Sequence, residues 1–63
     1  MAYVANFRDV QVMLSNRGAR LLKRTPVGDV YLDGFGQYIK VARNGSGWQI
    51  DVYGSLAACG CDG

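Results

Sequence analysis

The stretch "QYIKVARNGSGWQIDVYG", residues 37–54, alternates between two classes of side chain on both sides of a glycine-rich segment. Such alternation is typical of strands that bury one face. One class is apolar and suits a core: Ile39, Val41, Trp48, Ile50 and Val52. The other class is charged or amphipathic: Tyr38, Lys40, Gln49, Asp51 and Tyr53. We therefore predict two antiparallel strands, 37–43 and 48–54, joined by the loop "NGSG" (44–47).

The length of this loop predicts the register of the two strands. A four-residue loop pairs Arg43 with Trp48. Counting on from that pair places apolar residues opposite one another on one face: Val41 with Ile50, and Ile39 with Val52. On the other face it places Lys40 opposite Asp51, and Tyr38 opposite Tyr53.

Two turns upstream predict two further strands. In "TPVGD" (25–29), Pro26 suits the first corner of a turn and Gly28 the position that requires a positive φ. This turn would join a strand at 19–25 to one at 30–33. Because the turn can close in two registers, the first strand places either Arg20 and Arg24 or Leu21 and Lys23 on the outer face.

The segment "DGFG" (33–36) predicts the turn between the strand at 30–33 and the strand at 37–43. A four-residue turn here would pair Val30 with Ile39 on the inner face and Tyr31 with Tyr38 on the outer face. The inner face would then carry seven apolar residues: Val30, Leu32, Ile39, Val41, Trp48, Ile50 and Val52.

The N-terminal part of the chain predicts one amphipathic helix. Asn6 suits the N-cap and Asp9 the first turn, and an apolar stripe follows at Phe7, Val10, Met13 and Leu14. Gly18 favours a helix end near Asn16 or Arg17, and the alternative is a helix that continues to Arg24. Residues 2–4 could add a short edge strand.

These elements predict an α+β fold with one N-terminal helix packed on one face of a three- to four-stranded antiparallel meander sheet. The opposite face of the sheet would be open, since one helix covers one face. We expect a single small domain at 1–57, followed by a flexible Cys/Gly tail at 58–63. The first ten residues lack the pattern of a signal peptide and no apolar run approaches membrane-spanning length, so we expect a cytoplasmic protein.

The amino-acid composition argues against catalysis. The chain of 63 residues has no histidine, which removes the commonest general base and the commonest metal ligand. Cys59 and Cys61 supply at most half of a zinc site, and a disulfide across one residue would be strained. We therefore expect no catalytic residue, no metal and no cofactor.

The outer face is the predicted binding surface. It would carry Tyr31, Tyr38 and Tyr53 in a row, beside Lys40 and a basic cluster that includes Arg20, Lys23 and Arg24. A stiff, partly apolar patch of this kind is typical of contact surfaces. The net charge of +2 permits nucleic-acid binding without indicating it.

Three functions fit this surface. The first is a non-enzymatic protein-binding module, such as a small inhibitor or regulator from a phage or mobile element that occupies a host nucleic-acid-processing machine, for example a CRISPR effector or a polymerase. The second is a single-stranded nucleic-acid-binding protein in which bases stack on the tyrosines. The third is a homodimer formed through the same face.

One resemblance concerns topology alone. A helix followed by three strands resembles the small mRNA-cleaving toxins that are built on a double-stranded-RNA-binding-like core. Those toxins use a histidine, which this chain lacks, so the resemblance does not imply RNA cleavage.

Overall fold

The computed structural model describes residues 2–60, which form five strands and two helices. The predicted α+β class is confirmed, with five strands where three to four were expected. The elements, in chain order, are β1 (Ala2–Val4), α1 (Phe7–Asn16), β2 (Arg20–Thr25), β3 (Gly28–Leu32), β4 (Tyr38–Asn44), β5 (Gly47–Tyr53) and α2 (Leu56–Cys59).

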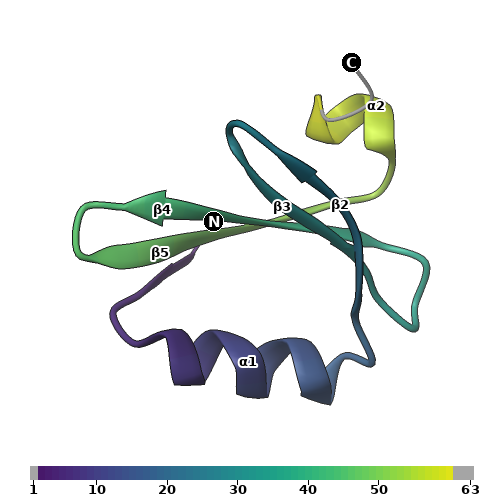
Figure 1. Cartoon of the computed structure of the whole chain (residues 1–63). Helices are drawn as coiled ribbons and strands as arrows, with labels where there is room; N and C mark the ends of the chain where they lie inside the picture. Colours follow the sequence, from purple (N-terminus) through teal and green to yellow (C-terminus); the bar gives the residue numbers. More distant parts are fainter. Residues whose placement is uncertain (1, 61–63) are drawn as a thin grey trace.

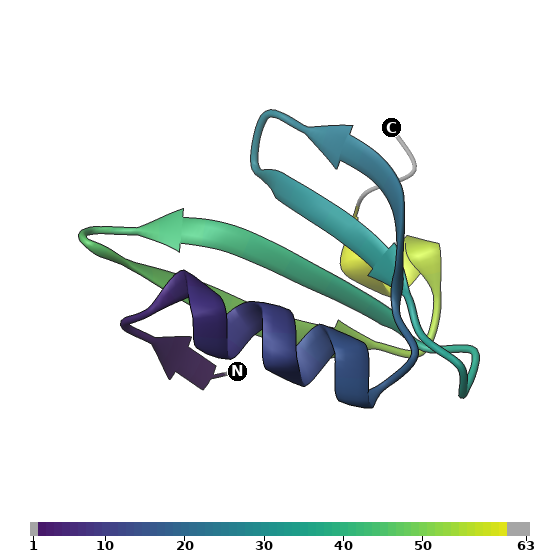
Figure 2. The ribbon, with the colours of Figure 1, turned by 60° about the horizontal axis from the view of Figure 1, so that its bottom comes forward.

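The strands form one antiparallel sheet in the order β1-β5-β4-β3-β2. The first two strands therefore lie at opposite edges, and α1, which connects them, crosses one face of the sheet. Figure 1 shows α1 on one face and α2 on the other. In Figure 2 the β2–β3 hairpin extends beyond the part of the sheet that α1 covers.

Local capping sets both ends of α1. The Asn6 side chain accepts a hydrogen bond from the Arg8 amide at 2.9 Å. At the other end Gly18 adopts a left-handed conformation with φ of 65°. The amide of Ala19 donates to Leu14 O at 2.9 Å and that of Gly18 to Ser15 O at 3.1 Å. These two bonds make a Schellman motif, which confirms the shorter of the two predicted helices.

The register predicted between β4 and β5 is confirmed at every pair. Val41 lies opposite Ile50, and Lys40 lies opposite Asp51. The strands continue to the pair of Asn44 and Gly47, so that the connection itself is shorter than predicted. Shortening a hairpin by one residue on each side keeps the parity of the pairs, and every side chain stays on its predicted face.

The register predicted between β3 and β4 is wrong by one residue. Val30 lies opposite Lys40 rather than Ile39, and Tyr31 lies opposite Ile39 rather than Tyr38. The Asp33 amide donates to Gln37 O at 2.9 Å, which leaves the odd-numbered loop 34–36 in place of a four-residue turn. An odd slip transfers every side chain of β3 to the other face.

This slip divides the apolar residues between two cores. The core beneath α1 contains Val10, Leu14, Ile39, Val41 and Ile50, with Tyr31, Trp48, Val4, Met13 and Ala19 packed around it. Val30 is buried on the opposite face, whereas Leu32 and Val52 are exposed although both were predicted to face the core.

A second, smaller core lies beneath α2. Val30 and Cys59 are buried there, and Tyr38, Tyr53 and Leu56 pack against them. The side chain of Ser55 caps α2 by accepting a hydrogen bond from the Ala58 amide at 3.1 Å. The predicted boundary between domain and tail at residue 57 thus falls inside a helix, and the face predicted to be open is partly covered. Residues 61–63 of the predicted tail, including Cys61, lie outside the described residues.

Neither of the helices found within residues 2–60 is long and apolar enough to cross a bilayer.

Candidate binding surface

The three predicted tyrosines do not share one face. Tyr38 and Tyr53 lie opposite each other on the α2 side of the sheet, where both are half-buried in the smaller core. Tyr31 packs against the core beneath α1 because of the shifted β3–β4 register. The predicted row of three stacking platforms is therefore wrong.

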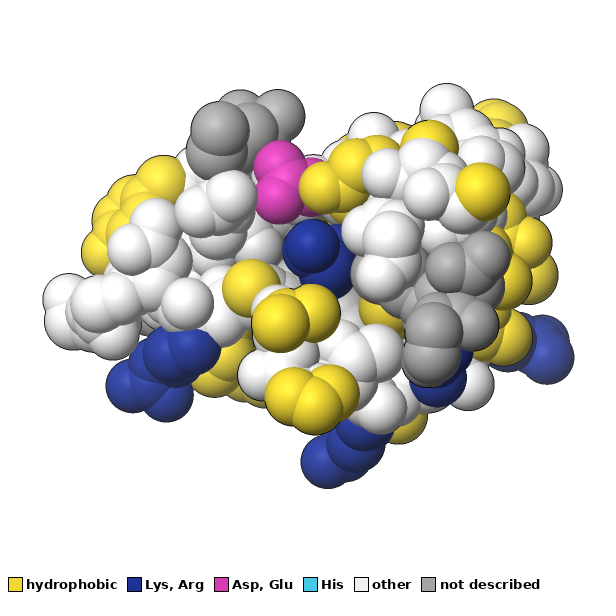
Figure 3. Space-filling view, turned by 90° about the horizontal axis from the view of Figure 1, so that it is seen from above, with side chains coloured by type: hydrophobic (Ala, Val, Ile, Leu, Met, Phe, Trp, Pro, Cys, Tyr) yellow, Lys and Arg dark blue, Asp and Glu magenta, His cyan; other side chains and the backbone are white. Residues whose placement is uncertain are grey.

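Lys40 lies on the same face as Tyr38 and Tyr53, within a group of polar side chains. Its Nζ lies 5.8 Å from the centroid of the Tyr53 ring, and its cross-strand neighbour is Asp51. Gln49 Nε2 donates to Asp51 Oδ2 at 3.2 Å. Figure 3, which looks onto this face, shows an acidic and a basic group close together in the middle and other basic groups at the margin. The centre of this face thus carries charges of both signs.

A bulge in β2 distributes the basic cluster over both faces. Arg20 lies opposite Leu32 and Lys23 opposite Val30, so both basic residues belong to the α2 side. Arg24 lies opposite Asp29 and belongs to the α1 side. The register shifts between Leu21 and Lys23, which is why neither of the two predicted alternatives occurs: an extra residue reverses the alternation within the strand.

The sequence reasoning missed two leucines on this strand. Leu21 and Leu22 are each 45% exposed, and neither was among the predicted binding residues. The signal available in the sequence was the pair "LL" between cations in "RLLKR" (20–24), which does not alternate. We call Arg20, Leu21, Leu22, Lys23 and Arg24 the β2 edge surface, since β2 has a neighbouring strand on one side alone.

The one buried carboxylate among residues 2–60 stabilises the fold. The side chain of Asp33 accepts hydrogen bonds from the amides of Phe35 at 2.9 Å and Gln37 at 2.8 Å. Arg17, at the end of α1, forms an ion pair with it at 3.0 Å and also donates to Gln37 Oε1. Burial on its own would raise the pKa of Asp33, but the bonds from Gln37, Phe35 and Arg17 outweigh it and lower the pKa below 3.8.

Within residues 2–60 no three His, Cys, Asp or Glu residues gather in a group that could hold a metal ion. In that same part of the chain every buried side-chain nitrogen and oxygen has a hydrogen-bond partner. The buried polar side chains of these residues are thus hydrogen-bonded within the fold.

No protein-family model matches this chain, and neither a curated protein nor a solved structure matches it.

Proposed function

We propose that the chain is a non-enzymatic protein-binding module of the cytoplasm that acts by occupying the surface of a partner protein through the β2 edge surface. The observation that carries this proposal is the exposure of Leu21 and Leu22 on an edge strand between cations. Exposing two adjacent leucines to water is unfavourable in free energy. Burial of these side chains against another protein removes that unfavourable contribution. A regulator or inhibitor that blocks a partner's surface needs no catalytic group.

The chemistry of the surface indicates the kind of partner. Arg20 and Arg24 are exposed on either side of the two leucines. An apolar strip with a positive rim complements a partner surface that is apolar at its centre and acidic around it. A second copy of this chain is a poorer match, since it would bring the cations of two β2 edges together.

The bulge supports recognition by side chains rather than by an added strand. A continuous edge strand offers regularly spaced backbone groups to an incoming strand, and a bulge interrupts them. In β2 the bulge falls at Leu22, in the middle of the strand. Leucine contacts should therefore contribute more to affinity than backbone pairing does.

The test compares two sets of substitutions. Wild-type chain, Leu21→Ser/Leu22→Ser and Arg20→Gln/Arg24→Gln are immobilised and exposed to a nuclease-treated lysate of the source cells. The partner that the wild type captures is then purified, and its affinity for each variant is measured by calorimetry. Loss of two leucine contacts should weaken binding at least about tenfold, because burying one leucine is worth about 1.5–3 kcal/mol. Val12→Ser, at an exposed apolar position on α1, is the matched control and should bind as the wild type does.

Nucleic-acid binding makes the opposite prediction. Labelled single-stranded oligonucleotides would bind with steep salt dependence, would lose affinity in Arg20→Gln/Arg24→Gln and would keep it in Leu21→Ser/Leu22→Ser. That pattern, or a captured protein that binds the leucine variant as tightly as the wild type, would overturn the proposal. A mass of twice 6.8 kDa that returns to the monomer value in the leucine variant would assign the surface to a homodimer instead.

A further inference from the structure

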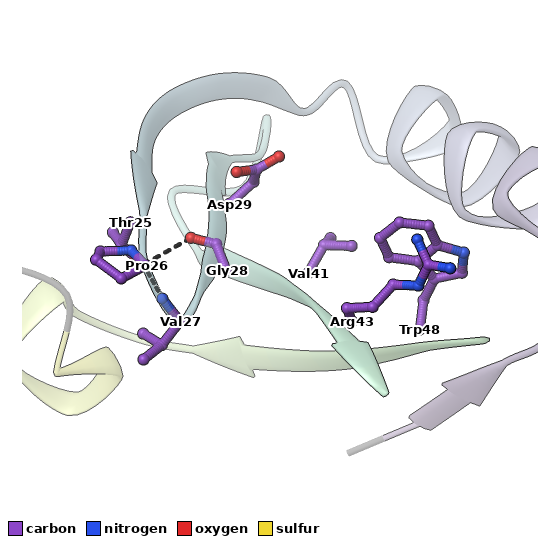
Figure 4. Close-up of a pocket in the computed structure, with 8 residues that line it drawn as sticks. All are labelled: Thr25, Pro26, Val27, Gly28, Asp29, Val41, Arg43 and Trp48. Carbon is purple, nitrogen blue, oxygen red and sulfur yellow. Dashed lines mark hydrogen bonds between the residues drawn. The ribbon is translucent and has the colours of Figure 1, made fainter. Parts of the chain in front are cut away.

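The α1 side of the sheet has a solvent-open depression at the end that α1 leaves uncovered. Its volume is about 470 Å³. Val41 of β4 lies between its two walls, which are the turn containing Pro26 and Val27 and the pair of Arg43 and Trp48. Figure 4 shows the turn on one side and the Arg43–Trp48 pair on the other. The depression begins where β2 ends, so it continues the surface on which Leu21 and Arg24 lie.

Arg43 is held in place without an acidic partner. Its Cζ lies 4.8 Å from the centroid of the Trp48 ring, and Trp48 in turn contacts the ring of Phe7 with centroids 4.8 Å apart. Arg43 forms no ion pair with any of residues 2–60, in contrast to Arg17, which pairs with Asp33. Stacking on an aromatic ring orients a guanidinium and leaves its edge free to donate two parallel hydrogen bonds to a carboxylate.

The charges around the depression favour an anion on the Arg43 side. Asp29 also lines the depression, but its cross-strand neighbour is Arg24, which offsets its charge from the β2 side. The cross-strand neighbour of Arg43 is the neutral Trp48. A carboxylate bound in the depression would therefore lie beside an apolar wall and next to Arg43, whose charge its cross-strand neighbour does not offset.

We propose that this depression receives an apolar side chain of the protein partner, with an adjacent carboxylate of the partner paired to Arg43. The inference rests on the proposed function and assigns the depression as the place where the partner inserts its anchor. Val27, which is 62% exposed, and Val41 would contact the apolar group. A polar-rimmed pocket of this size accommodates one large side chain and leaves the rest of the partner to contact the β2 edge surface.

A small aromatic acid tests the depression without the partner. The probe is 3-phenylpropionate, and its uncharged analogue 3-phenylpropionamide measures the contribution of the carboxylate. Trp48 is the sole tryptophan of the chain, so its fluorescence reports binding directly, and amide shifts of Val41 and Asp29 report the location. A ligand of this size should bind with a Kd of order 1–10 mM. An exposed ion pair should give the acid an advantage of about fivefold over the amide.

Substitutions identify the residue that binds the carboxylate of the probe. Arg43→Gln should reduce the affinity for the acid to that for the amide. Arg8→Gln, which removes an exposed arginine from α1, is the matched control and should leave the fivefold difference intact. Equal affinities of the wild type for acid and amide, an unchanged preference in Arg43→Gln, or no binding up to about 50 mM, well above the Kd expected here, would each overturn the inference.

The same variants separate this inference from the proposed function. If Leu21→Ser/Leu22→Ser loses the captured partner while Arg43→Gln retains wild-type affinity, the protein-binding function stands and the depression is not the anchor site. If the leucine variant binds the partner normally, the proposed function itself fails. If both variants lose at least about fivefold in affinity, the two proposals are supported together.

Discussion

The carboxylate of Asp33 connects two segments that are far apart in the sequence, the end of α1 and the β3–β4 loop. It binds the amides of the β3–β4 loop and the guanidinium of Arg17, and the carbonyl of Arg17 accepts a hydrogen bond from the Gly34 amide at 2.9 Å. The end of α1 is thereby tied to the loop that sets the face of β3. Because these bonds favour the ionised form, the pKa of Asp33 is lower in the folded chain than in the unfolded chain.

The free energy of unfolding should therefore decrease in acid because Asp33 becomes protonated. Well above its ordinary pKa of 3.8 the contribution of Asp33 is complete, and it is lost as the pH falls from about 5 through the lowered folded-state pKa. Urea unfolding between pH 7 and 2.5 should show this loss in the wild type, whereas Asp33→Asn should be less stable at pH 7 and have a shallower decline.

Asp29→Asn is the matched control for the pH experiment, since the Asp29 carboxylate forms no hydrogen bond or ion pair within residues 2–60. It should keep the wild-type decline in acid. A decline in Asp33→Asn as steep as that of the wild type would show that another group causes the acid sensitivity.

At the scale of the elements, α2 gives the sheet a second covered face. It has four residues, Leu56–Cys59, yet it buries Val30 and half-buries Tyr38 and Tyr53. A helix this short is unstable alone, so α2 depends on its packing against β4 and β5. Tyr38 and Tyr53 therefore contribute to the packing of the smaller core beneath α2.

Shortening Leu56 measures how much α2 contributes. Leu56→Ala removes a half-buried side chain and should lower the free energy of unfolding by about 1–2 kcal/mol, roughly half the effect at a fully buried site. The exposed substitution Ala57→Ser should change it by less than about 0.5 kcal/mol. Both values come from urea unfolding at neutral pH. A Leu56→Ala chain as stable as the wild type would mean that α2 does not pack on the sheet in solution.

At the scale of the whole molecule, a single sheet carries both cores. Ile39 contributes to the core beneath α1, and Tyr38, its neighbour on the same strand, to the core beneath α2. Loss of either helix would expose one face of the same strands. We expect the two cores to be lost together, in one cooperative transition.

Two probes should therefore report the same unfolding curve. Trp48 fluorescence follows the α1 side, and far-ultraviolet circular dichroism follows all helices and strands. Their urea midpoints should coincide, with a free energy of unfolding of about 3–9 kcal/mol for a chain of this length. Separate midpoints would show that the α2 face unfolds independently of the α1 face.

Features that depend on neighbouring residues were predicted from the sequence. Asn6 and Gly18 set the ends of α1 through bonds within the helix turn, and both ends were predicted. The register of β4 and β5 was predicted because a short loop connects two strands whose apolar residues alternate. Of the predicted binding residues, Tyr38, Lys40 and Tyr53 lie on one side of the sheet as predicted, although α2 covers part of it. The sides of Arg20, Lys23 and Arg24 could not be predicted, because the bulge in β2 is not visible in the sequence.

Features that depend on distant residues emerged only from the folded chain. The slip of β3 follows from a loop that is organised by Asp33 and Arg17, which are 16 positions apart. The bulge at Leu22 and the burial of Val30 by Cys59 likewise require partners from other elements. A sequence pattern reports which side chains alternate, but the parity of a loop depends on hydrogen bonds that form after the elements meet. For this reason the sequence did not predict that Tyr31 packs against the core beneath α1 or that the leucines of β2 are exposed.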